Sequence, residues 1–174
     1  MYNNYYNPYN PYLNYYNSNN PYNPYYNRYI QEQLNQNQIK DHGAEPLVVN
    51  MENITKQNNN FRTTLWTGNH MQITLMTINP GESIGLELHP DVDQFLRIEQ
   101  GNGVVKMGDL KENLDFERIV YDDFAIVIPA GKWHNIINIG NIPLKLYSIY
   151  APPEHKKGTI HKTKYDAIQD EHEH

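Results

Sequence analysis

From residue 44 onward the sequence predicts an all-β fold, a sandwich or a barrel, and three observations support this. Short segments rich in β-branched and aromatic residues recur at nearly regular spacing. Residues that favour turns separate most of these segments, and no long amphipathic helix lies among them. The chain has 174 residues, which suits a single domain on the rule of about 100–200 residues per domain.

The predicted strands follow one another closely along this part of the chain. Turn-forming pairs such as Pro80-Gly81 separate them, and after Pro152-Pro153 the sequence becomes polar. There, residues 160–168 predict an extended arm or a short helix, and residues 169–174 predict a frayed end. The ten predicted strands cover residues 46–50, 61–67, 71–78, 85–89, 94–99, 104–107, 116–120, 124–128, 133–138 and 144–150.

The first 43 residues have a different composition. Residues 1–30 contain 11 tyrosines, 10 asparagines and 4 prolines. Such a segment cannot bury enough apolar surface to offset an ordering cost of about 1–2 kcal/mol per residue. Residues 31–43 are rich in Gln and Asn and are typical of a linker. We therefore expect a disordered low-complexity tail and linker over 1–43, a folded domain over 44–168 and a frayed C-terminus over 169–174.

Composition and charge exclude several classes of function. The absence of cysteine excludes disulfides, thiolate metal sites and a cysteine nucleophile. Residues 1–43 carry two basic and two acidic side chains, so the net charge of −6 belongs to residues 44–174 and argues against a nucleic-acid partner. No apolar run approaches the ~20 residues of a membrane helix, and no signal peptide is recognisable. We expect cytoplasmic synthesis and no membrane partner.

Two segments carry side chains that suit metal chemistry. Glu87 and His89 are two residues apart, so on a strand they point to the same face. A turn through residues 90–93 would bring Gln94 back beside them. His134 stands on a predicted strand much later in the chain.

The spacing of these residues resembles that of the cupin superfamily over about residues 44–165. The first cupin motif reads Gly, five residues, His, one residue, His, three or four residues, Glu, six residues, Gly. Here the corresponding positions are Gly81, Glu87, His89, Gln94 and Gly101, with intervals of five, one, four and six residues. All the intervals of the motif are therefore present.

The second cupin motif appears further along the chain. It reads Gly, five residues, Pro, one residue, Gly, two residues, His, three residues, Asn. Here it corresponds to Asp123, Pro129, Gly131, His134 and Asn138, and only the first position departs from the pattern. Because two gapped patterns agree in the right order, the resemblance implies a cupin jelly-roll β-barrel, also called a double-stranded β-helix.

The sequence departs from the usual cupin site of three histidines and one glutamate. Glu87 stands in place of the first histidine and Gln94 in place of the glutamate, so the number of carboxylates is unchanged. The resemblance implies that Glu87, His89 and His134 bind one metal ion. Gln94 is either a weaker fourth ligand or a hydrogen-bond partner of a metal-bound water. Asn138 is expected to bond backbone groups at a strand end.

The expected cofactor is a divalent transition metal: Fe, Mn, Zn, Ni or Co. Two histidines and one carboxylate suit Fe(II) with open coordination positions, and zinc with a bound water is the alternative. His172 and His174 alternate with acidic residues at the end of the chain and can bind metal adventitiously. No residue is assigned a catalytic role from the sequence.

Two functions from different classes follow. The stretches 89–95 and 150–155 are similar to those of small single-domain cupins described as mannose-6-phosphate isomerase-like (cupin type-2). This resemblance implies a metal-dependent isomerase or dioxygenase that acts on, or simply binds, a small polar molecule, for example a sugar-like one. The same resemblance implies a homodimer. Alternatively, the Tyr/Asn/Pro-rich tail resembles low-complexity tracts of spore-coat proteins, which implies a structural protein that self-assembles into a coat layer. The fold alone does not choose between them.

Overall fold

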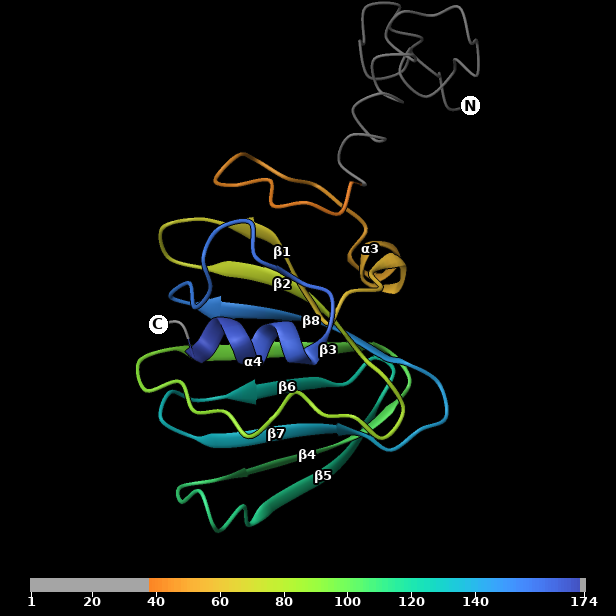
Figure 1. Ribbon diagram of the computed structural model, residues 1–174, viewed down its shortest axis with the longest axis vertical. Helices are drawn as coiled ribbons and strands as arrows, with labels where there is room; N and C mark the ends of the chain where they lie inside the picture. The colour runs from red at the N-terminus through yellow and green to blue at the C-terminus, as the bar shows by residue number, and fades with distance from the viewer. Residues whose placement is uncertain (1–37, 173–174) are drawn as a thin grey trace, which may run out of the picture. The chain divides into compact units, whose positions relative to one another are not determined.

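Figure 1 shows the computed structural model of the chain, in which residues 38–172 are described. The predicted tail over 1–30 and most of the predicted linker lie outside the described residues. The described residues from Ile39 onward form one compact unit. The sequence-based boundaries at residues 43 and 168 stay predictions.

The described residues form nine strands and two short helices, so the fold consists mainly of β-strands. The helices are α3 (Met51–Gln57) and α4 (Lys164–His172). No helix in the described part of the chain is long and apolar enough to cross a membrane. The strands are β1 (Arg62–Thr67), β2 (Gln72–Ile78), β3 (Asp93–Gln100), β4 (Asn102–Gly108), β5 (Phe116–Tyr121), β6 (Ala125–Ile128), β7 (Trp133–Asn138), β8 (Leu144–Ala151) and β9 (Ile160–His161).

Two antiparallel sheets build the barrel (Figure 1). The larger sheet has the strand order β6-β3-β8-β2-β1-β9, and the smaller one has the order β5-β4-β7. One hydrophobic core joins them, because buried residues of the larger sheet such as Leu96 and Leu146 cluster with Val105 and Ile136 of the smaller sheet. The prediction of an all-β jelly-roll barrel is therefore confirmed.

On the larger sheet, the buried side chains change from apolar to polar from one end of the strands to the other. At one end Ile98 of β3 pairs with Leu146 of β8, and both are fully buried. At the other end Gln94 pairs with Tyr150, which in turn pairs with Gln72 of β2, and these three side chains are also buried. Buried polar groups need hydrogen-bond partners or a ligand, so this polar end is where a functional site is expected.

The segment predicted as the first strand, residues 46–50, is extended but pairs with no strand in the described structure and leads into α3 instead. The helix begins because Asn50 caps it: the Asn50 side chain accepts a hydrogen bond from the backbone N–H of Asn53 at 2.9 Å. At the other end, the buried Lys145 ammonium donates to the carbonyl oxygens of Lys56 and Asn58. The asparagine cap therefore fixes the start of α3 directly after the short apolar run.

Of two other predicted elements, one takes a different form and one takes the forms expected. The predicted strand at 85–89 is reduced to one isolated bridge, between Glu87 and His134 of β7, and a second bridge just before it joins Ser83 to Ile137. The segment 160–168 takes both of the forms expected for it. Its first two residues form β9 against β1, and α4 follows.

Candidate metal site

The polar end of the barrel brings Glu87, His89 and His134 together. The backbone of Glu87 forms two hydrogen bonds with that of His134: Glu87 N–H donates at 3.0 Å and His134 N–H donates at 2.9 Å. Two residues further, the carbonyl oxygen of His89 accepts a hydrogen bond from Gly131 N–H at 2.8 Å. Gly131 has φ +76°, a conformation that favours glycine, and it completes the turn that leads into β7.

The three side chains are close enough to share one ion. The Glu87 Oε2 atom lies 3.6 Å from His89 Nε2 and 3.9 Å from His134 Nε2. One ligand atom from each residue lies within 4.8 Å of the other two. Two ligands that each bind one ion at about 2.1 Å are at most ~4.2 Å apart, so both carboxylate-to-imidazole separations are compatible with a shared metal. Among the described residues, this is the one group of its kind.

The hydrogen bonds of the two histidines leave the metal-facing nitrogens available. His89 Nδ1 lies 3.0 Å from Glu154 Oε1, and His134 Nδ1 lies 2.9 Å from the carbonyl oxygen of Lys132. Both partners are acceptors, which places the proton of each neutral ring on Nδ1. Both Nε2 atoms are buried and have no hydrogen-bond partner among the described residues. A buried acceptor of this kind is what a metal ion satisfies.

Glu87 remains a carboxylate despite its burial. Burial raises its pKa, but the ion pair with the His89 imidazole and the positive charge of Arg62 outweigh that effect, and the pKa is lowered. An Arg62 Nη atom lies 3.3 Å from Glu87 Oε1, and only 2% of the arginine side chain is exposed. The Oε2 atom faces the two histidines, so each carboxylate oxygen has a separate role.

The two histidines have opposite pKa shifts. Burial lowers the pKa of His89, but the carboxylates of Glu154 and Glu87 more than compensate and raise it to about 9. Burial dominates at His134 and lowers its pKa, so that imidazole is neutral. In the metal-free protein, therefore, a protonated His89 provides the positive charge next to Glu87. A metal ion would replace the proton on His89 Nε2 and leave the proton on Nδ1 in place.

The fourth predicted ligand, Gln94, lies at the same end of the barrel. Its Nε2 atom donates a hydrogen bond to Ser148 Oγ at 2.9 Å. Its Oε1 atom is buried and has no hydrogen-bond partner among the described residues. The neighbouring Tyr150 packs edge-on against the His89 ring, with centroids 5.7 Å apart. Metal ligation by Gln94 stays a prediction.

Asn138, in contrast, bonds backbone groups as expected. Its Nδ2 atom donates to the carbonyl oxygens of Ile78 and Ile142, at 2.8 Å in each case. Sequence reasoning overlooked two residues of the site, Arg62 and Glu154. For Arg62, the available signal was its charge at the start of a strand whose other residues are mostly apolar or small. Glu154 follows a pair of prolines after the last long strand, and nothing in its own segment indicated that it contacts His89.

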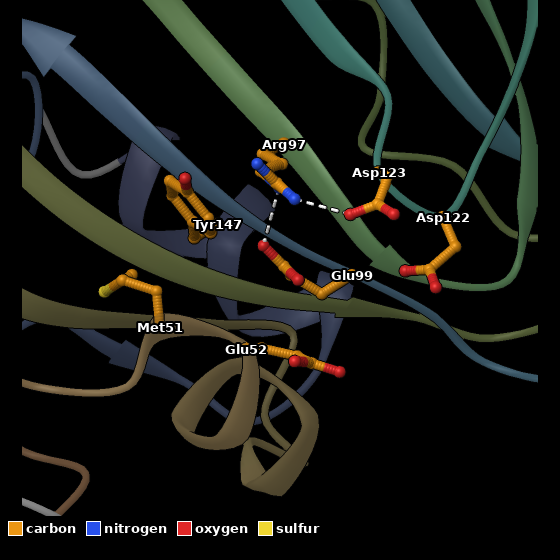
Figure 2. Close-up of a pocket in the computed structure, with 7 residues that line it drawn as sticks. All are labelled: Met51, Glu52, Arg97, Glu99, Asp122, Asp123 and Tyr147. Atoms are coloured by element: carbon orange, nitrogen blue, oxygen red, sulfur yellow. Dashed lines mark hydrogen bonds and ion pairs between the residues drawn. The ribbon is translucent and has the colours of Figure 1, made fainter.

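A second group of charged side chains forms a pocket of about 310 Å³ on the outer side of the larger sheet (Figure 2). We call it the acidic pocket. Arg97 lies between Glu99 and Asp123, and its Nε atom is 3.1 Å from Glu99 Oε1. The pocket is lined by Met51, Glu52, Arg97, Glu99, Asp122, Asp123 and Tyr147. It contains no imidazole.

Comparisons with known proteins agree with this fold. The family model described as "Cupin domain" matches residues 74–150. The uncharacterized protein YrkC of Bacillus subtilis is 67% identical over 130 residues, which are 75% of this chain and 70% of that protein. The uncharacterized protein L612 of Acanthamoeba polyphaga mimivirus is 42% identical over 127 residues, 72% of this chain and 73% of the relative.

A solved structure is also similar. The crystal structure of BH2720 from Bacillus halodurans is 60% identical in sequence, with a TM-score of 0.75. The match covers 75% of this chain and 99% of that protein.

Proposed function

This chain belongs to the cupin domain family, and on that premise we propose that it is a metal-binding cupin that binds or acts on a small polar molecule. Glu87, His89 and His134 hold the metal. The observation that carries the proposal is the pair of buried, unpartnered Nε2 atoms that face one carboxylate oxygen of Glu87. A structural role for these side chains would not require both nitrogens to lack partners among the described residues.

The donor set limits the choice of metal. Two imidazoles and one carboxylate accept Fe, Mn, Zn, Ni or Co, and the facial arrangement of such a set suits Fe(II). A bound metal of this kind supplies either Lewis acidity at a substrate oxygen or an oxygen-binding centre. The corresponding reaction classes are isomerase-like and oxygenase-like, with a sugar-like substrate in the former case.

The protein's own residues prepare the site for a small polar ligand. Arg62 holds the charge of Glu87 in place, and the buried oxygen of Gln94 can accept a hydrogen bond from a ligand or a metal-bound water. The fully buried side chains of Leu96 and Ile136, each two residues from a site residue, belong to the hydrophobic core. A ligand with hydroxyl or carbonyl oxygens would use these groups.

The test is metal content of the full chain. Chelator-treated protein is loaded separately with Fe(II), Mn, Zn, Ni or Co, and metal per chain is measured after desalting. Because His172 and His174 can bind metal adventitiously, a variant with both replaced by alanine is the reference. We expect about one equivalent in that reference and none after the further change His134→Ala. Equal metal content in the two proteins would contradict the proposal.

A second proposal rests on the sequence of residues 1–30 alone, which lie outside the described structure. Closely spaced tyrosine and asparagine side chains favour self-association, and we propose that this segment drives assembly in a spore-coat-type layer, with the barrel, as a homodimer, serving as the building block. Light scattering of the full chain and of a chain lacking residues 1–37, across a concentration series, tests it. Identical scattering would contradict it.

A further inference from the structure

We propose that Glu154 is the positioning residue of the metal site, and that its carboxylate fixes the His89 ring so that Nε2 faces the ion. The proposal rests on the proposed function, because it assigns to Glu154 a role in metal binding. Glu154 Oε1 lies 3.0 Å from His89 Nδ1 although the two residues are 65 positions apart. No motif of the sequence contains this contact.

The contact determines how His89 can bind a metal. A carboxylate only accepts hydrogen bonds, so the proton must be on Nδ1 and the lone pair of the neutral ring on Nε2. Nε2 then lies 3.6 Å from Glu87 Oε2, within the site. A hydrogen bond to a carboxylate also makes the imidazole a better electron donor, and such outer contacts influence metal affinity strongly.

His134 does not depend on a distant residue in this way. Its Nδ1 atom is 2.9 Å from the carbonyl oxygen of Lys132, only two residues earlier in the chain. That acceptor is neutral and comes with the backbone next to β7 itself. His89 follows a segment that forms only isolated bridges, and the acceptor for its Nδ1 atom comes from the segment after β8. Removing the Glu154 carboxylate is therefore expected to affect His89 and to leave the other histidine ligand, His134, unchanged.

The segment that carries Glu154 is itself held firmly. Gln72, whose side chain is fully buried, accepts from the backbone N–H of His155 at 2.9 Å and donates to its carbonyl oxygen at 2.8 Å. Gln72 Nε2 also donates to Thr67 Oγ1, which donates to Asp41 Oδ2 at 2.6 Å. These bonds fasten the chain next to Glu154 to β1 and β2. The carboxylate is thus presented to His89 by a rigid support.

The position of Glu154 makes it suitable for mutation. About 30% of its side chain is exposed, so truncation opens no cavity in the hydrophobic core. Replacement by glutamine keeps an oxygen that can accept the Nδ1 proton but removes the negative charge. Glu112, an exposed residue on the connection between β4 and β5, provides a matched control for the loss of a surface carboxylate.

The experiment uses the full chain with His172 and His174 replaced by alanine, and Co²⁺ as the probe. We compare Glu154→Ala, Glu154→Gln and Glu112→Ala by competition with a chelator of known affinity, by the visible spectrum of bound Co²⁺ and by the melting temperature of the metal-free protein. We expect Glu154→Ala to weaken Co²⁺ binding about 10–100-fold and to change the spectrum. The metal-free melting temperature should fall only modestly, because the partly exposed Glu154 carboxylate is one of two that face His89. Glu154→Gln should recover part of the affinity, and Glu112→Ala should behave as the parent.

The outcomes separate this proposal from the one on which it rests. If the parent binds one Co²⁺ and Glu154→Ala binds it equally tightly with the same spectrum, Glu154 has no positioning role and the metal site stands. A lowered metal-free melting temperature with unchanged affinity would also overturn the proposal, because it indicates a structural role only. If the parent itself binds no Co²⁺, the proposed function fails before any variant is compared.

Discussion

Carboxylates gather in two regions of the described molecule, and the regions differ in what their charges face. At the polar end of the barrel, Glu87 faces two imidazoles whose Nε2 atoms have no hydrogen-bond partner there. In the acidic pocket, Glu99 and Asp123 face the Arg97 guanidinium, which already pairs with both (Figure 2). One region has buried ligand atoms without a partner among the described residues, and in the other a guanidinium already pairs with two of the carboxylates.

This difference shows why a count of acidic residues does not identify a metal site. The acidic pocket has more carboxylates than the barrel site, but Glu52 and Asp123 are largely exposed and remain hydrated. Exposed carboxylates lose little when no ion is bound. Burial makes the barrel site different. The neutral His134 keeps a buried Nε2 atom without a hydrogen-bond partner among the described residues, and such a nitrogen costs free energy until a ligand satisfies it. His89 is a buried cation beside Glu87 until a metal ion replaces its proton. Substitutions in each of the two regions test this contrast.

The largest expected effect on stability is that of Glu87→Ala in the metal-free protein. The substitution removes the carboxylate that faces the buried Arg62 guanidinium, and removing one member of a buried ion pair costs about 3–5 kcal/mol. Urea denaturation of chelator-treated protein measures the free energy of unfolding. Glu52→Gln in the acidic pocket is the control, since Glu52 forms an exposed pair with Lys56. Its loss should cost less than ~1 kcal/mol. Equal losses for the two variants would contradict the contrast.

The next effect is stabilisation by metal. A metal that binds only the folded state at 100 times its dissociation constant adds about 2.7 kcal/mol to the free energy of unfolding. We expect this gain in the parent and in Asp122→Asn of the acidic pocket, and no gain in His134→Ala. Denaturation with and without added metal measures it. If metal no longer stabilises Asp122→Asn but still stabilises His134→Ala, the ion binds in the acidic pocket, and our proposal is contradicted.

The overall fold could be predicted because its signals are local. Turn residues at fixed intervals separate the strands, and the punctuation around Gly81, Gly101 and Pro129 fixes where the strands begin and end. The helix α3 escaped prediction because seven residues with one capping asparagine give a weak signal. The segment 85–89 alternates like a strand, but it forms only one isolated bridge to β7, and sequence alternation does not report how many neighbours a strand acquires.

Prediction of the site was limited in another way. Glu87, His89 and His134 stand at motif positions, so their spacing along the chain was enough to indicate them. Arg62 and Glu154 contact the same side chains from β1 and from the segment after β8. Their roles depend on the closure of the barrel, which brings together residues 25 and 65 positions apart. The spacing of residues along the sequence therefore does not predict contacts that form only when the barrel closes.

The pH dependence of stability provides a third prediction. His89 has a pKa raised to about 9 in the folded, metal-free protein, so its contribution to stability is fully present below its ordinary value of 6.5. That contribution is lost as the pH rises through about 9. We expect the free energy of unfolding of the metal-free parent to fall between pH 6.5 and 9 relative to that of His89→Gln. Parallel pH profiles for the two proteins would show that the Glu87 and Glu154 carboxylates do not hold this proton.

The smallest effect is expected in the acidic pocket, at Glu99. Burial, together with the nearby carboxylates of Glu52, Asp122 and Asp123, raises the pKa of Glu99, although Arg97 opposes the shift. A carboxyl group with a raised pKa stabilises the fold at pH values below its ordinary pKa, and this contribution is lost as the pH rises. The ionised Glu99 side chain therefore weakens the fold at neutral pH.

Glu99→Gln tests this effect, because it keeps an oxygen that can accept a hydrogen bond from Arg97 Nε and removes the charge. We therefore expect this variant to gain slightly in stability relative to the parent at pH 7, less at pH 4, and to bind metal as the parent does. Urea denaturation at both pH values, with Glu112→Gln as the control for losing one negative charge, measures the difference. A loss of stability at pH 7 would mean that the ion pair with Arg97 outweighs burial, and the acidic pocket would then be a stabilising network instead of a tolerated concentration of charge.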